Sequence, residues 1–189
     1  MQLNRTNLKD IFFKNYSANL KKLITFDTSN IRKLFQVIKC LEVIKNNNKK
    51  VIIFGNGGSA AIANHFSVDL TKVCNIRCVN FNESSFLTCF ANDYGYENWV
   101  AKALDFHCDE QDMVILISSS GESKNMIKAA KFVKKRMPLI TFTGFKKNNS
   151  LSKIGDINFW VNSKKYNHVE NVHQIFLLSL VDYIASKKI

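Results

Sequence analysis

The stretch VIIFGNGGS, residues 51–59, decides the fold of this chain. Its four apolar residues, three of them β-branched, predict a short buried strand of the kind found in parallel sheets, and the glycines end it. A second stretch, MVILISSSGES at residues 113–123, repeats the pattern of a buried strand followed by a turn of serine and glycine. Apolar residues at helical spacing follow both turns, so each turn is expected to join a strand to a helix.

The rest of the chain continues this alternation and predicts an α/β fold, a five-stranded parallel doubly wound sheet flanked by helices. A single domain over residues 1–189 is expected, with an N-terminal helical pair (1–48) for oligomer packing before an α/β sandwich (49–189). A turn, ANDYG at 91–95, separates the fourth and fifth predicted helices. The predicted strands are 51–54, 77–81, 113–118, 138–144 and 157–161, and the predicted helices are 4–23, 28–48, 59–72, 83–90, 96–107, 123–135 and 168–186.

The composition narrows the class of protein. The 189 residues carry a net charge of +12, but the lysines are scattered and form no long block. A solvated basic surface is therefore favoured over nucleic-acid binding, and a positive field also suits a phosphorylated ligand. No run of about 18 apolar residues is present, and the start of the chain does not read as a signal peptide. Cytoplasmic location and no membrane partner are the expectation.

The two serine-and-glycine turns predict an anion site. In an open parallel sheet ligands bind beyond the carboxyl ends of the strands, where helix N-termini offer unpaired N–H groups. Glycines allow close approach of the backbone and serines add hydroxyl donors, which together suit a phosphate. A simpler interpretation is that the two turns only cap helices. Another is that the first turn binds a dinucleotide, because GNGGSA fits a loose GxGxxA pattern with Glu83 after it. A dinucleotide site would give the second turn no role.

Two pairs of polar residues are candidates for chemistry. His65 and Asp69 share one helix face, as either a self-satisfied pair at a helix contact or an acid/base or metal pair below the first turn. His173 lies on the apolar face of the last helix, where a core role and a site role are both open, and Glu170 is three residues earlier. If the last helix crosses the site, the four side chains could assemble and would suit a divalent metal.

Several motifs together resemble the SIS (sugar isomerase) domain family, and within it the phosphoheptose isomerase branch. They are GNGGSAAIANHFSVDL, ANDYGYEN, ISSSGESKNMIKA, ITFTG and VENVHQIF, which follow in register over essentially the whole chain. The resemblance implies that the phosphate is held by the serine turn and that Asn92 and Asp93 touch the sugar, from this or a neighbouring subunit. The implied substrate-binding residues are Asn56, Gly57, Gly58, Ser59, Asn92, Asp93, Ser118, Ser119, Ser120, Ser123 and Glu170.

The resemblance also implies a function. An aldose–ketose isomerase is expected that converts sedoheptulose 7-phosphate to a heptose 7-phosphate for surface polysaccharide synthesis. Asp69, Glu170 and His173 are the expected catalytic residues. Some members bind zinc, for which His65, Asp69 and Glu170 are the candidate ligands. The family usually forms homotetramers whose N-terminal helices pack together.

Four departures from the family pattern bear on this expectation. Asp69 replaces a glutamate, Glu170 a glutamine and Glu122 an asparagine, while Leu178 stands where the family has its catalytic and zinc-binding histidine. Leucine neither transfers protons nor binds metals, and only His173 could substitute. The alternative is therefore a non-catalytic SIS module that binds a phosphosugar or bridges partner proteins, as in the replication-initiator-associating branch.

Overall fold

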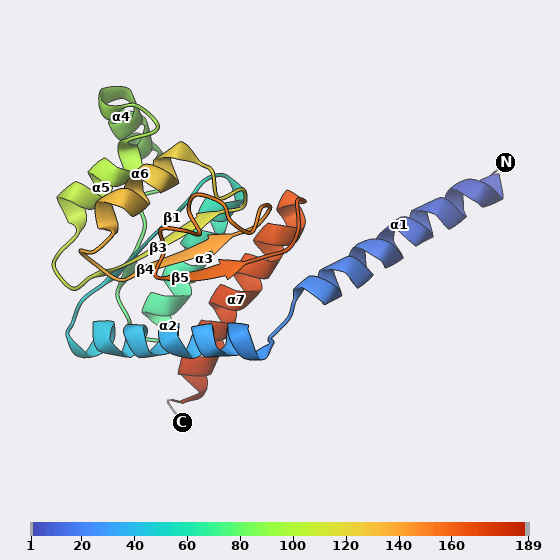
Figure 1. The fold of residues 1–189 in the computed structure, drawn as a ribbon, viewed down its shortest axis with the longest axis horizontal. Helices are drawn as coiled ribbons and strands as arrows, with labels where there is room; N and C mark the ends of the chain where they lie inside the picture. The colour runs from blue at the N-terminus through green and yellow to red at the C-terminus, as the bar shows by residue number, and fades with distance from the viewer. Residues whose placement is uncertain (1, 188–189) are drawn as a thin grey trace.

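Five parallel strands form one sheet in the order β2-β1-β3-β4-β5 (Figure 1). The structure is a computed structural model that describes residues 2–187, with side chains from residue 8 onward. The predicted limits at residues 1 and 189 lie outside the described part. The strands are β1 (Val51–Gly55), β2 (Cys78–Val79), β3 (Met113–Ser118), β4 (Leu139–Thr143) and β5 (Ile157–Trp160). The helices are α1 (Gln2–Leu23), α2 (Thr28–Asn46), α3 (Gly58–Lys72), α4 (Ser84–Tyr94), α5 (Trp99–His107), α6 (Lys124–Val133) and α7 (Tyr166–Ser186).

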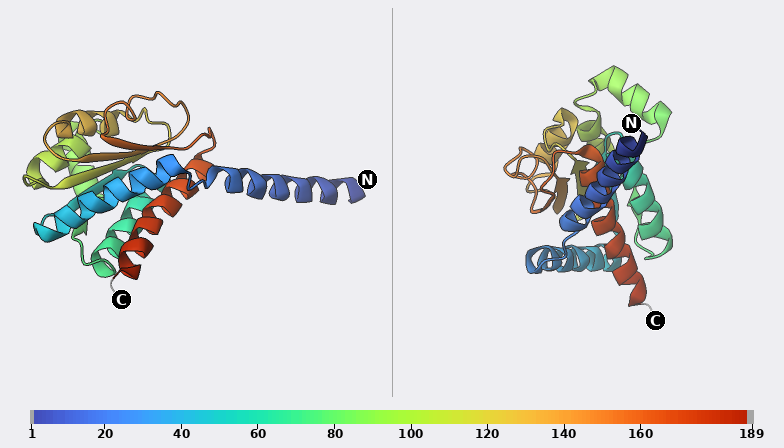
Figure 2. Two further views of the ribbon diagram at one scale, coloured as in Figure 1. Left: turned by 60° about the horizontal axis from the view of Figure 1, so that its bottom comes forward. Right: turned by 90° about the vertical axis from the view of Figure 1, so that its right-hand side faces the viewer.

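Helices cover both faces of the sheet (Figures 1 and 2). Successive strand residues point to opposite faces, so Ile53 and Ile115 pack in one core cluster with α2, α3 and α7. Phe54 and Leu116 pack in a second cluster with α5 and α6. Burial on both faces explains why the central strands are continuous apolar runs. The predicted fold class is confirmed.

The two N-terminal helices have different environments. The apolar stripe of α2 is buried in the first core cluster, where Leu34, Val37, Ile38, Leu41 and Ile44 pack. By contrast, α1 projects away from the body (Figures 1 and 2) and leaves Leu8, Ile11, Phe12 and Phe13 exposed. The C-terminal part of α1 contacts the body, where Leu20 and Leu23 pack against the first core cluster and Tyr16 packs edge-on on His168 of α7 at 4.5 Å between ring centroids. The two N-terminal helices therefore do not form a separate unit, because α2 is part of the α/β core.

Two predicted elements differ from the observed ones. The predicted strand 77–81 is only two residues long, because the Asn80 side chain bonds Ser67 Oγ and the backbone N–H of Asn82 instead of continuing the ladder. The predicted turn at 91–95 is mostly helical, since α4 continues to Tyr94 and ends where the Gly95 N–H bonds the Ala91 carbonyl. Within residues 2–187, no helix is both long and apolar enough to cross a membrane.

Candidate functional site

The two serine-and-glycine turns lie side by side. Strands β1 and β3 are neighbours in the sheet, with Gly55 opposite Ile117, and each runs directly into its turn. The first turn leads into α3 through Gly57, whose φ of 53° is a conformation that glycine adopts without strain. The second leads into α6 from its N-cap residue Ser123. The predicted meeting of the two turns at the carboxyl end of the sheet is therefore observed.

A pair of side-chain amides ties the two turns together. Asn56 Nδ2 donates to Asn125 Oδ1 at 3.0 Å, and Asn125 Nδ2 donates back to Asn56 Oδ1 at 2.9 Å. Inside the second turn, Ser118 Oγ donates to Ser123 Oγ at 3.1 Å and accepts from the Gly121 N–H at 3.2 Å. These bonds fix the helix N-termini of α3 and α6 relative to each other.

Between the turns lies a small polar cavity of about 90 Å³, called here the cradle. Its polar wall holds the hydroxyls that the sequence indicated, together with Glu170 from α7. The lining residues are Asn56, Ser59, Ile117, Ser118, Ser119, Ser120, Ser123, Tyr166 and Glu170. The cradle thus combines helix N-termini with four serines of the second turn, a donor set that suits a phosphate.

Glu170 places a carboxylate beside the cradle. It lies against Gly58 at the N-terminus of α3, so that a Cβ added at Gly58 would overlap its carboxylate. Ser119 Oγ lies 3.4 Å from Glu170 Oε1. In the described part of the chain no lysine, arginine or histidine forms an ion pair with Glu170. Its negative charge is therefore free to act on a ligand.

A second cavity of about 380 Å³ adjoins the cradle at Glu170 and runs between α3 and α7. His65 lines it and bonds Asp69 through Nε2 at 3.1 Å, while Gln174 from α7 lies 3.2 Å from Nδ1. The side chains of His65 and Asp69 are 47% and 31% exposed, so the pair lies on an open face of the single chain. Asp69 supports His65 from outside the cavity wall.

His173 does not belong to this site. It is fully buried, its Nε2 lies 3.1 Å from the Thr143 carbonyl oxygen of β4, and its ring packs on Phe142. Burial lowers the pKa of His173 to about 4, against a smaller opposing effect of the bond to Thr143. A neutral core histidine is the result. This placement speaks against the expected catalytic role, because the ring is separated from the cavities by the packing of α7 on the sheet.

Asn92 and Asp93 do not reach the cradle within one chain. Both are exposed near the end of α4, where Asn92 Nδ2 donates to Asp93 Oδ1. Tyr96, a little further along, bonds a residue of the cradle wall, because its hydroxyl donates to Asn56 Oδ1 at 3.2 Å. Sequence reasoning also missed Asn125 and Gln174. The only available signal was position, since Asn125 follows Ser123 by two residues and Gln174 lies one turn beyond Glu170.

The candidate metal ligands do not converge. Both ring nitrogens of His65 have protein partners, and Glu170 faces Gly58 and Ser119 instead. Among the described residues, no three His, Cys, Asp or Glu side chains lie close enough to hold a metal ion. As placed, this donor set does not fit a zinc ion, which takes three or four protein ligands.

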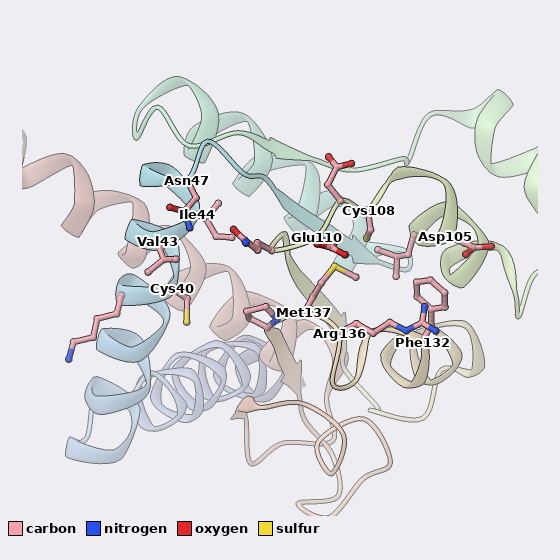
Figure 3. Close-up of a pocket in the computed structure, with 15 residues that line it drawn as sticks. Cys40, Val43, Ile44, Asn47, Asp105, Cys108, Glu110, Phe132, Arg136 and Met137 are labelled. Atoms are coloured by element: carbon pink, nitrogen blue, oxygen red, sulfur yellow. The ribbon is translucent and has the colours of Figure 1, made fainter.

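A further cavity, of about 920 Å³, lies at the other end of the sheet (Figure 3). Cys40, Val43 and Ile44 of α2 line one side, and Cys108 and Met137 line the other. Burial raises the pKa of the Cys108 thiol to about 12, which keeps it protonated. This cavity lies at the amino ends of strands and is mostly apolar. Its lining includes no serine, so it differs from the serine turn that marks the cradle.

The fold and the cradle define a phosphosugar-binding class of α/β domain. Consistent with this, the SIS domain pattern matches residues 11–144. The phosphoheptose isomerase of Thermodesulfovibrio yellowstonii is 32% identical over 88% of this chain and 86% of its own length. That of Helicobacter pylori is 29% identical over 94% and 95%. The structure of the phosphoheptose isomerase from Neisseria gonorrhoeae superposes with a TM-score of 0.81 at 24% identity, covering 98% of this chain and all of that one.

The chain therefore belongs to the SIS domain family, in its phosphoheptose isomerase branch. The curated relatives support the predicted enzyme class, an isomerase. The structural likeness supports the predicted fold.

Proposed function

We propose that this protein is an aldose–ketose isomerase acting on sedoheptulose 7-phosphate and yielding a heptose 7-phosphate for surface polysaccharide synthesis. One observation carries the proposal: the serine turn, an unpaired carboxylate and a carboxylate–histidine pair line two adjoining cavities. A phosphate in the cradle would place a sugar chain in the second cavity, between Glu170 and His65. The names of the curated relatives support the same reaction.

The reaction moves one proton between neighbouring carbons through an enediol, and it needs a base for the carbon and an acid for the carbonyl oxygen. In our proposal Glu170 is one of these groups and the His65–Asp69 pair is the other, with Asp69 the expected essential carboxylate. The hydroxyls of Ser118, Ser119, Ser120 and Ser123 hold the phosphate and anchor the substrate. No step requires His173 or a metal ion. The assay below therefore compares activity with and without zinc.

The proposal is tested by incubating the full chain with sedoheptulose 7-phosphate in deuterated water, with chelator and with added zinc. Formation of an aldose with deuterium at the carbon next to the carbonyl is the expected result. Absence of exchange and of aldose under both conditions would overturn the proposal. Binding of the sugar phosphate without turnover would instead indicate the non-catalytic SIS module, which the leucine at position 178 favours.

We also propose that the protein assembles as a homotetramer through α1, whose exposed Leu8, Ile11, Phe12 and Phe13 need an apolar partner. Light scattering coupled to gel filtration measures the mass directly, and a monomer of 21.7 kDa would refute this. Asn92 and Asp93 would then approach the cradle of a neighbouring subunit. Cytoplasmic location and the absence of nucleic-acid binding stay predictions.

A further inference from the structure

Asn56 is a residue of the cradle whose side chain is held by other residues of the protein. Its Oδ1 accepts two hydrogen bonds, from Asn125 Nδ2 at 2.9 Å and from the Tyr96 hydroxyl at 3.2 Å. Its Nδ2 donates to Asn125 Oδ1 at 3.0 Å. A carbonyl oxygen has two lone pairs, so the acceptor capacity of Oδ1 is used in full. The amide is therefore fixed in orientation before any ligand arrives.

Asn125 supplies most of this fixation. It is 2% exposed, in the first turn of α6, and its Oδ1 also accepts from the Met126 N–H at 3.1 Å. Asn56 is its side-chain partner for both the oxygen and the nitrogen. A buried amide that loses such partners is left without hydrogen bonds, which costs free energy. The reciprocal pair is therefore a rigid link between the two turns.

Tyr96 closes the link from the solvent side. Its side chain is largely exposed, at 53%, so packing alone does not fix the ring. The chain next to it is tethered to α6, where Lys128 Nζ donates to Glu97 Oε1 at 2.6 Å and to Asn98 Oδ1 at 2.8 Å. The tether brings the Tyr96 hydroxyl to Asn56, although α4 before it has no buried residue.

Asn56 also separates two cavities. On one side is the cradle, and on the other is a cavity of about 460 Å³ lined by Asn56, Tyr96, Glu97, Ser123, Lys124 and Asn125. Asn56 and Ser123 line both. A shift of the Asn56 amide would therefore open the cradle sideways and change the spacing of the first turn from the second.

We propose that Tyr96 and Asn125 are positioning residues of the phosphosugar site, which act through Asn56 to hold the two turns at the spacing that binds the phosphate. This inference rests on the proposed function for the identity of the ligand. Neither residue needs to touch the sugar. The loss of either should weaken binding of the phosphate group itself, so inorganic phosphate is as good a probe as the sugar phosphate.

The decisive experiment is a double-mutant cycle of Tyr96→Phe and Asn56→Ala, measured as Kd by calorimetry with inorganic phosphate and with sedoheptulose 7-phosphate. Tyr96→Phe removes one hydroxyl from an exposed ring, so the fold should persist. The Kd for both ligands should rise about two- to tenfold, the value of one hydrogen bond. In the Asn56→Ala background the same substitution should have no further effect, because its target is gone. Tyr94→Phe is the matched control, since that ring packs on Phe90 instead.

An unchanged Kd for Tyr96→Phe would overturn the inference. Full additivity with Asn56→Ala would also overturn it, because Tyr96 would then act on the ligand directly. Asn125→Ala should raise Kd more than Tyr96→Phe, and its melting temperature must be followed alongside. If the unaltered protein binds neither ligand, both the proposed function and this inference are wrong. If the unaltered protein binds the ligands and the variants have the same Kd, only this inference is wrong.

Discussion

The two turns occupy equivalent places, at the ends of neighbouring strands and the starts of helices, yet their surroundings differ. The N-terminus of α3 faces the carboxylate of Glu170, which lies there before any ligand binds. The N-terminus of α6 faces the serine hydroxyls of the cradle, and the carboxylate of Glu122 in the same turn is held by Ser150. Because a second anion beside Glu170 is repelled, the phosphate is better received at the second turn. We infer that the first turn serves the chemistry and the second serves binding.

This division is tested most severely by Asp69→Asn on the helix of the first turn. The amide keeps the size of the carboxylate and removes its charge and basicity. We expect kcat to fall by roughly 10²- to 10⁴-fold, the usual worth of an acid/base group, with little change in the Kd for inorganic phosphate. An unaltered kcat would show that Asp69 has no part in the mechanism. A loss of phosphate affinity as large as the loss of kcat would show that the two turns do not have separate roles.

Gly58→Ala probes the same side without touching a charge. The new methyl group overlaps the Glu170 carboxylate, which ends a flexible side chain and can move aside at little cost in stability. A displacement of this size can cost about a hundredfold in rate, so kcat should fall while the melting temperature stays nearly constant. Equal activity would mean that Glu170 need not rest at the first turn.

His173 allows a test of whether this histidine is a buried, neutral residue of the core outside the site. Its folded pKa of about 4 lies below the ordinary value of 6.5, so between these values the unfolded chain binds more protons. Stability is therefore full above about pH 6.5 and declines as the pH falls towards 4, by up to about 3 kcal/mol. Urea unfolding of the protein and of His173→Gln should diverge across this window. A flat difference between the two would contradict burial of the neutral ring.

On the second turn, Ser123→Ala should change affinity and leave kcat almost intact. One hydrogen bond to a charged phosphate is lost, for which a rise of about tenfold in Kd and KM is expected. The substitution also removes the bond from Ser118 Oγ. A fall in kcat with unchanged KM would reverse the assignment of the two turns.

Glu122→Gln should have the smallest effect. The carboxylate of Glu122 accepts from the Ser150 N–H and hydroxyl, and these bonds lower its pKa. Because the group is exposed, the bonds brace the second turn only weakly. We expect about a twofold rise in the Kd for phosphate at neutral pH. The difference should shrink as the pH falls through the lowered pKa, because the carboxylate of the unaltered protein is then neutralised as well. Phosphate titrations at neutral and acidic pH measure both.

The fold could be predicted from short runs of sequence. VIIF and MVILIS are buried on both faces of the sheet, and such runs allow little other than central parallel strands. The placement of the two turns followed from the same strands. These features depend on local pattern and on a general rule of sheet topology, which a single sequence contains.

The side chains that reach the cradle could not be predicted equally well. Glu170 and His173 are three residues apart on α7, but one turn of helix decides that the first meets the loops and the second meets the β4 carbonyl. Likewise α4 runs on through Tyr94, so Tyr96 and not Asn92 arrives at Asn56. Such outcomes depend on how a helix crosses the sheet and where it ends, which long-range packing decides.

The projecting helix α1 has a consequence of its own. Leu8, Ile11, Phe12 and Phe13 are exposed in a single chain, and helices in proteins gain most of their stability from packing. If copies of the chain cover these side chains, the stability of the α1 helix depends on the protein's concentration. In the same way, the stability of a protein that binds a ligand depends on the ligand's concentration. Dilution should then melt α1 first, and through Tyr16 on His168 it would loosen the end of α7 that carries Glu170.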